Sequence, residues 1–156
     1  GPSSRSASCR TYRSTYRSLS TCNGMSTKDI GNRGEEIASI YLANKGYVIL
    51  ERNWKTRWCE IDIVAQKDNC IYFVEVKYRK SSDYGDALSY ITPKKVQQMS
   101  FAAELWMQSR RYDGDCQLAA LAVMGDGSEV QFLDDLEKSF MKSIELIKEL
   151  KLTAID

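Results

Sequence analysis

Residues 60–77 read EIDIVAQKDNCIYFVEVK, and this stretch decides how the chain folds. Two runs rich in Ile, Val, Tyr and Phe flank a short polar segment, a pattern typical of two neighbouring strands. Asp and Asn tolerate positive φ, so Asp68 and Asn69 predict a two-residue hairpin turn. With that turn, Asp62 faces Glu75 and Glu60 faces Lys77 across the hairpin.

Both faces of the predicted hairpin are apolar near the turn. This indicates central strands that are covered on both sides. One face carries Val64, Ile71 and Phe73, and the other carries Ile61, Ile63, Ala65, Tyr72, Val74 and Val76.

Hydrophobic periodicity places further helices and strands around the hairpin. We expect a helix over 31–45 closed by Gly46, strands at 47–53, 60–66 and 70–78, a polar loop at 79–92, a helix opened by Pro93, strands at 116–123 and 129–133, and a helix from 134. The order αβββαββα predicts an α/β fold with a mixed sheet flanked by helices.

The two ends of the chain differ in composition from the middle. Residues 1–24 hold seven serines, three threonines, four arginines and no acid, which predicts a disordered tail. Its Gly-Pro start and Met25 suggest that part of this tail is not natural. At the other end, 134–156 predicts an amphipathic helix packed on the domain, with a docking or dimer helix as the alternative. Its apolar face would hold Leu136, Phe140, Ile144 and Ile147.

Composition excludes several classes of protein. The chain has no histidine, which excludes imidazole-based triads and HExxH zinc hydrolases. The five cysteines form no CxxC pair, so we expect reduced thiols. No apolar run is long enough to span a bilayer, which predicts a soluble, cytoplasmic protein without membrane partners. Without the four arginines of 1–24, 18 basic and 21 acidic residues remain, a net charge of −3, so any nucleic-acid contact must be local.

The facing carboxylates of Asp62 and Glu75 are the feature that suggests chemistry. Acids this close raise one another's pKa or bind a cation, and oxygen ligands favour Mg²⁺ or Mn²⁺. Lys77 shares the face of Glu75, where an ammonium can hold a phosphate oxygen or orient a water. The alternative is a solvated charge lattice in which Glu60 pairs with Lys77.

Short motifs also follow one another in a specific order over residues 31–132. They are GNRGE at 31–35, GY at 46–47, RN at 52–53, EIDIVA at 60–65, FVEVK at 73–77 and YG at 84–85. Together they resemble the YraN-like family of bacterial proteins, which belongs to the PD-(D/E)xK nuclease superfamily and is similar to archaeal Holliday-junction resolvases.

The resemblance implies a restriction-endonuclease-like domain at 25–133 and a metal-dependent endonuclease acting on branched or single-stranded DNA. It implies that Asp62, Glu75 and the Val76 carbonyl hold the metal ion and that Lys77 is the catalytic lysine. Glu35 would be an accessory acid, or else a first-turn acid that complements the helix dipole. Lys95 would lie near the phosphate, or else be a solvated charge.

Basic and aromatic residues flank the predicted site on both strands. Arg52, Lys55 and Arg57 alternate with tryptophans and are candidates for DNA contact, although alternating strand faces produce the same pattern. Tyr78, Arg79 and Lys80 continue the strand of Glu75 and are further candidates. A homodimer would suit a two-stranded substrate. A catalytically silent binding module and a purely structural cation site remain as alternatives.

Overall fold

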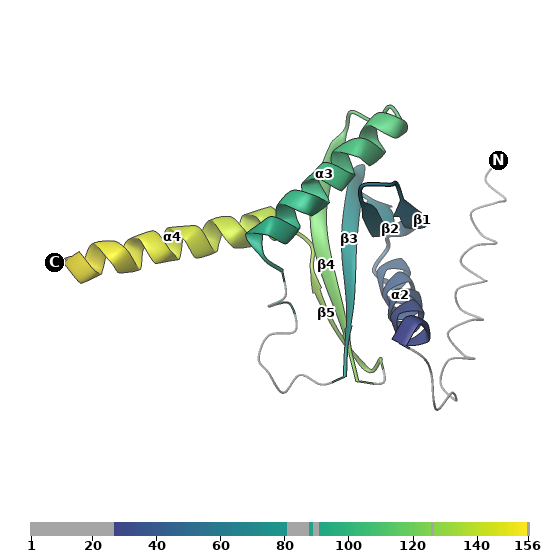
Figure 1. The fold of residues 1–156 in the computed structure, drawn as a ribbon, viewed down its shortest axis with the longest axis horizontal. Helices are drawn as coiled ribbons and strands as arrows, with labels where there is room; N and C mark the ends of the chain where they lie inside the picture. Colours follow the sequence, from purple (N-terminus) through teal and green to yellow (C-terminus); the bar gives the residue numbers. More distant parts are fainter. Residues whose placement is uncertain (1–26, 81–87, 89–90, 126, 156) are drawn as a thin grey trace.

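The computed structural model describes residues 27–80, 88, 91–125 and 127–155. The order αβββαββα is confirmed (Figure 1). The predicted tail at 1–24 and most of the predicted loop at 79–92 lie outside the described residues. The elements are α2 (Thr27–Asn44), β1 (Val48–Lys55), β2 (Glu60–Lys67), β3 (Cys70–Arg79), α3 (Pro93–Ser109), β4 (Asp115–Met124), β5 (Glu129–Leu133) and α4 (Leu136–Ile155).

The five strands form one mixed sheet with helices packed on both of its faces. The strand order is β1-β2-β3-β4-β5, and only β3 and β4 run parallel. Phe73 packs with Met99 and Trp106 of α3, whereas its neighbour Val74 packs with Leu42 of α2. Because neighbouring strand residues point to opposite faces, α2 and α3 cover opposite sides of the sheet.

The predicted hairpin turn between β2 and β3 is confirmed. Asp68 and Asn69 have φ values of 51° and 62°, as a type I′ turn requires. Lys67 pairs with Cys70, and the predicted register holds as far as Ile63 opposite Val74.

The paired ladder ends there, so neither the predicted pair of Asp62 with Glu75 nor that of Glu60 with Lys77 belongs to it. There β2 continues with β1, placing Glu60 opposite Lys55, while β3 continues its parallel ladder with β4 as far as Arg79. Pairing between β2 and β3 therefore ends before Asp62 and Glu75, while β2 stays paired with β1 and β3 stays paired with β4.

Ile61 is buried, but the face of the sheet predicted for it is wrong. Ile61 packs on the α3 side of the sheet, whereas Ile63 packs on the α2 side, as predicted. Regular alternation would put both on one face, so β2 changes face between them. The partner strand is irregular at the same level, because Asn53 has a φ of 53°. Asp62 lies at this change of face.

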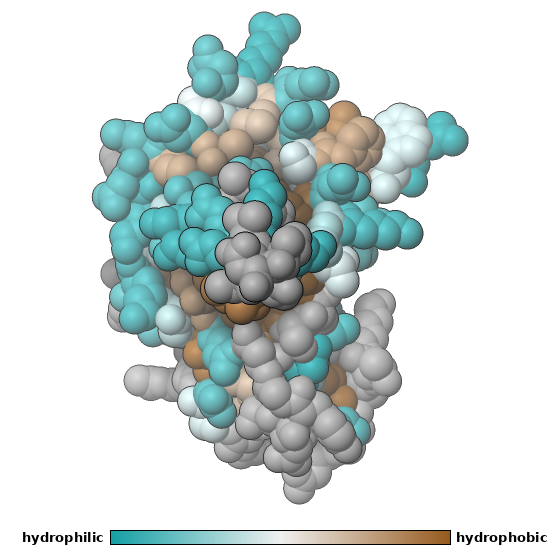
Figure 2. Space-filling model, turned by 90° about the vertical axis from the view of Figure 1, so that its left-hand side faces the viewer, coloured by the Kyte–Doolittle hydropathy of each residue, from teal (hydrophilic) through white to brown (hydrophobic). Residues whose placement is uncertain are grey.

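Helix α4 begins against the sheet and then points away from it (Figure 1). Leu136 in its first turn is fully buried, whereas Leu146 is 57% exposed. The side chains of Phe140, Ile144 and Ile147 lie outside the described residues, so the apolar face of α4 stays a prediction. Figure 2, viewed from the end where α4 projects, shows a largely hydrophilic surface with a hydrophobic patch toward its upper right. None of the described helices is long and apolar enough to cross a membrane.

Candidate active site

The Asp62 carboxylate lies where the pairing between β2 and β3 has ended. The N–H of Val76 donates a 2.8 Å hydrogen bond to Oδ2 of Asp62. A side-chain oxygen thus takes the place of the main-chain partner that a continued ladder would supply. Asp62 is held between the two strands, next to the residue that follows Glu75.

The surroundings of Asp62 make its ionised form costly. Burial first, and then the negative charge of Glu75, raise the pKa of Asp62 from 3.8 to about 7. The hydrogen bond from Val76 acts in the opposite direction, and the charges of Glu35 and Glu60 raise the pKa further. The ionised form of Asp62 is therefore destabilised both by burial and by the negative charges of three neighbouring acids.

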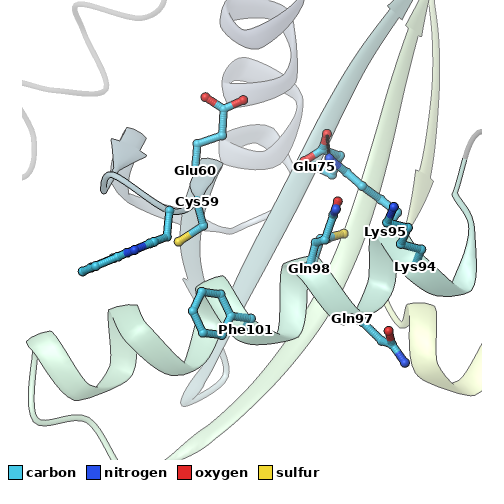
Figure 3. Close-up of a pocket in the computed structure, with 10 residues that line it drawn as sticks. Cys59, Glu60, Glu75, Lys94, Lys95, Gln97, Gln98 and Phe101 are labelled. Atoms are coloured by element: carbon cyan, nitrogen blue, oxygen red, sulfur yellow. Dashed lines mark ion pairs between the residues drawn. The ribbon is translucent and has the colours of Figure 1, made fainter.

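Glu75 is balanced by an amine from the opposite layer. Nζ of Lys95 on α3 lies 2.9 Å from Oε1 of Glu75, and the two side chains are 34% and 18% exposed. Figure 3 shows Lys95 reaching from the helix to the strand. The start of α3 fixes this placement, because Pro93 opens the helix and Thr92 accepts a 3.1 Å bond from the Lys95 N–H. The repulsion expected between Asp62 and Glu75 is thus eased by one hydrogen bond and one ion pair.

On the α2 side, Glu35 is held by β1. Nδ2 of Asn53 donates a 2.7 Å bond to Oε2 of Glu35, and Arg52 lies 3.9 Å from the same oxygen. Helix α2 comes close to β3 at Gly34, where an added Cβ would lie only 3.3 Å from Cβ of Tyr78. The irregular backbone of Asn53 and the glycine before Glu35 thus bring this acid into the field of Asp62.

The predicted catalytic lysine, Lys77, lies two residues beyond Glu75 on β3. By strand alternation it shares the face of Glu75, as predicted, and it is opposite Ala122 of β4. Its side chain is exposed and forms no ion pair within the described part of the chain. The amine that contacts Glu75 is that of Lys95, so the role of Lys77 stays a prediction.

Glu75 also lines a cleft of about 530 Å³ between the start of β2 and α3. Neither Asp62 nor Lys77 is among its lining residues, which are Trp58, Cys59, Glu60, Glu75, Lys94, Lys95, Gln97, Gln98, Met99 and Phe101. Sequence reasoning missed the contribution of α3 beyond Lys95. The signal in the sequence was Phe101, an apolar residue on the otherwise polar face of this helix.

The candidates for DNA contact on β1 and in the connection that follows it have different surroundings. Arg52 forms ion pairs with Glu36 and Glu35 of α2, and Lys55 lies 3.8 Å from Glu60. Arg57 lies over the ring of Trp58, 5.2 Å from its centroid. Of these three cations, Arg52 is the one whose charge is already neutralised by two acids.

The candidates for DNA contact at the end of β3 and just after it are Tyr78, Arg79 and Lys80. The Tyr78 hydroxyl donates to the Gly125 carbonyl, and the Arg79 carbonyl accepts from the Gly125 N–H. Lys80 is exposed just after the strand. Contact of these residues with nucleic acid stays a prediction.

The donor set of the site suits a hard divalent ion. Among the described residues, no three His, Cys, Asp or Glu side chains converge closely enough to hold a metal ion. Mg²⁺ needs fewer, since it is commonly bound by one or two carboxylates with waters and substrate phosphate completing the shell. The raised pKa of Asp62 beside Glu75 is the observation that fits such an ion, because a cation would favour both ionised forms.

Comparison with known proteins places the chain in a family. The profile of UPF0102, described as an uncharacterised protein family, matches residues 34–123. A UPF0102 protein of Syntrophomonas wolfei is 46% identical over 82 residues, which cover 53% of this chain and 71% of the relative. Relatives from Flavobacterium psychrophilum and Vibrio parahaemolyticus are 36% and 32% identical over 112 residues, covering 72% and 70% of this chain and 93% of each relative. The chain therefore belongs to the UPF0102 family, the YraN-like family that its motifs resemble.

Proposed function

We propose that this protein is a metal-dependent endonuclease of the PD-(D/E)xK type that hydrolyses phosphodiester bonds in branched or single-stranded DNA. The observation that carries the proposal is the position of Asp62. It lies where two strands separate, it is bonded to Val76 N–H, and its pKa is raised by burial and by Glu75. An acid whose pKa is strongly raised by burial and by a specific charged neighbour is a mark of functional sites.

Asp62, Glu75 and the main-chain carbonyl of Val76 are the groups that would hold Mg²⁺ or Mn²⁺. When bound, such an ion stabilises negative charge on a phosphate and lowers the pKa of a water molecule. These donors come from two adjacent strands of a sheet covered on both faces, so their positions are fixed by the core.

The basic residues supply the remaining electrostatics. Lys95 orients Glu75 through its 2.9 Å ion pair, and its ammonium is close enough to the acids to attract a phosphate oxygen. Lys77, exposed on the face of Glu75, would stabilise the charge that develops on phosphorus. Glu35, held by Asn53, would act as an accessory acid that orients water.

The proposal is tested by cleavage of a substrate panel. Wild type, Glu75→Ala and the control Glu104→Ala, an exposed acid on α3, are incubated with forked, Holliday-junction, single-stranded and duplex DNA. We expect cleavage of branched or single-stranded DNA in Mg²⁺ or Mn²⁺ and none in EDTA. Glu75→Ala should lose the activity while Glu104→Ala keeps it. Equal cleavage by wild type and Glu75→Ala would assign the activity to a contaminant.

A second candidate is a DNA-binding module that keeps this fold without turnover. The ion pair between Lys95 and Glu75 favours it, because it already neutralises one of the two acids. DNA binding that persists in EDTA, with no product from any substrate in any metal, would support this second function over the first.

A further inference from the structure

Two large aromatic side chains are exposed on opposite walls of the cleft that contains Glu75. Trp58, in the connection between β1 and β2, is 69% exposed, and Phe101 of α3 is 50% exposed. Each belongs to a different layer of the fold, yet both line the same space of about 530 Å³. Exposed aromatic surface of this kind is unfavourable in water and marks a binding surface when it lines a concave site.

We propose that this cleft binds an unpaired nucleobase of single-stranded DNA, stacked against Trp58 and Phe101. The proposal rests on the endonuclease function above and names the part of the substrate that the enzyme recognises. Bases stack on aromatic side chains without regard to sequence, because every base has a π-face.

Cations flank the two rings and can meet the backbone on either side of such a base, while the acids Glu60 and Glu75 also line the cleft. The guanidinium of Arg57 lies 5.2 Å from the centre of the Trp58 ring. Lys94, exposed in the first turn of α3, and Lys95 line the opposite wall. An extended strand that places one base in the cleft would bring phosphates to cations on both sides.

Polar groups in the cleft can also meet the edge of a base. Gln98 points from α3 toward the strand that carries Glu75, whereas Gln97 points away from it (Figure 3). The Gln98 amide offers both a donor and an acceptor. Glu75 lies in the same cleft, so a base seated there would hold its neighbouring phosphate beside the candidate catalytic acids.

This arrangement selects against intact duplex. In paired DNA both faces of a base are covered by its neighbours, and exposing them costs unstacking and unpairing free energy. An unpaired nucleotide at a fork or a strand end enters the cleft without that cost. The cleft would therefore account for a preference for branched or single-stranded DNA.

The test measures binding in EDTA, so that no cleavage intervenes. Full-length protein is titrated into a fluorescein-labelled oligothymidine, into a duplex of equal length, and into single strands that carry one 2-aminopurine. We expect tighter binding to the single strand and quenching of 2-aminopurine. Trp58→Ala and Phe101→Ala should each weaken single-strand binding by about five- to a hundredfold, the range for losing one stacked base.

Matched variants show whether the rings act by stacking. Trp58→Phe keeps a ring and should recover most of the affinity, and Val48→Ala removes another exposed apolar group, 47% exposed and outside the cleft, and should bind as wild type. Equal binding of duplex and single strand, or wild-type affinity in both Trp58→Ala and Phe101→Ala, would overturn the proposal.

Parallel cleavage assays in Mg²⁺ separate this proposal from the proposed function. Cleavage of DNA without quenching of 2-aminopurine would refute the base-binding site and leave the proposed endonuclease function standing. Quenching that depends on both rings, with no cleavage of any substrate, would refute the endonuclease function and support the base-binding site.

Discussion

Nζ of Lys95 lies 2.9 Å from Oε1 of Glu75, so a cation from α3 reaches across to β3, the strand that carries two of the three candidate metal ligands. Glu75 also raises the pKa of Asp62 through its negative charge. The ion pair therefore offsets part of a repulsion that the fold builds into this site. A divalent ion bound between the two acids would offset the same repulsion and compete with Lys95.

Replacing Lys95 with alanine should make the protein less stable and more responsive to metal. We expect Lys95→Ala to lower the free energy of unfolding by about 1 kcal/mol or less, because Lys95 is partly exposed and its ion pair is screened, and to lower Tm by a few degrees. Mg²⁺ should raise the Tm of Lys95→Ala by more than that of wild type, because Lys95 no longer offsets the repulsion between Asp62 and Glu75. Differential scanning calorimetry with and without Mg²⁺ measures both effects.

Lys94→Ala is the matched control, because Lys94 is exposed on the same turn and forms no ion pair within the described residues. Its Tm and its response to Mg²⁺ should match those of wild type. An equal response to Mg²⁺ in Lys95→Ala and wild type would mean that the ion does not bind at Glu75.

The hairpin was predictable because its determinants are local. Two residues that tolerate positive φ, Asp68 and Asn69, fix the turn, and the turn fixes the register of the residues nearest to it. Pro93 likewise marks the start of α3 from its own position. Such features depend on neighbours in the sequence, so no knowledge of the fold is required.

The candidate site was predictable only in part, because its geometry depends on contacts distant in sequence. The point where β2 leaves β3 is set by pairing with β1 and β4, which no hairpin rule contains. The face change at Ile61 lies beside the left-handed Asn53 of another strand. The partner of Glu75 comes from a helix twenty residues later in the chain, and sequence alone could not choose between Lys77 and Lys95.

The raised pKa of Asp62 predicts how stability changes with pH. Burial and Glu75 raise that pKa from 3.8 to about 7, so between these values the folded protein holds a proton that the unfolded chain has released. Raising the pH through this window therefore lowers the free energy of unfolding, by at most about 1.4 kcal/mol per pH unit from this group. The effect should level off above pH 7. Urea unfolding at intervals from pH 4 to pH 8 measures the slope.

Asp62→Asn cannot ionise and should flatten that part of the pH profile, whereas Asp113→Asn, at an exposed position, should leave it unchanged. Mg²⁺ should stabilise wild type more at pH 8 than at pH 6, because the ion binds the ionised carboxylate. Stabilisation by Mg²⁺ that is lost in Asp62→Asn, without cleavage of any DNA, would indicate a purely structural cation site. An identical slope in wild type and Asp62→Asn would show that Asp62 has an ordinary pKa.

The turn between β2 and β3 predicts opposite effects for two substitutions at one position. Asn69 has a φ of 62°, where a β-branched residue is strained by roughly 1–2 kcal/mol and glycine is not. We expect Asn69→Val to lower the free energy of unfolding by about that amount and Asn69→Gly to change it little. Thermal melts of the two variants beside wild type provide the comparison. Equal stability of Asn69→Val and Asn69→Gly would mean that the turn adopts another conformation in solution.

Lys77 should contribute little to stability, because it is exposed and forms no ion pair within the described part of the chain. Lys77→Ala should therefore change the free energy of unfolding by less than about 0.5 kcal/mol. If Lys77 stabilises the charge developing on phosphorus, the same variant should lose about a hundredfold or more in kcat with little change in KM. Steady-state cleavage of the best substrate of the panel, together with a thermal melt, separates the two effects.

Lys80→Ala provides the comparison for Lys77→Ala, because Lys80 is also exposed, three residues further along. A residue that only contacts backbone phosphate contributes equally to substrate and transition-state binding, so Lys80→Ala should raise KM and leave kcat unchanged. If Lys77→Ala instead cleaves at the wild-type rate while Lys95→Ala does not, the ammonium that acts on the phosphate is the one already seated beside Glu75. The catalytic lysine of this protein would then come from α3, and the Glu-x-Lys spacing of β3 would mark only the position of the acid.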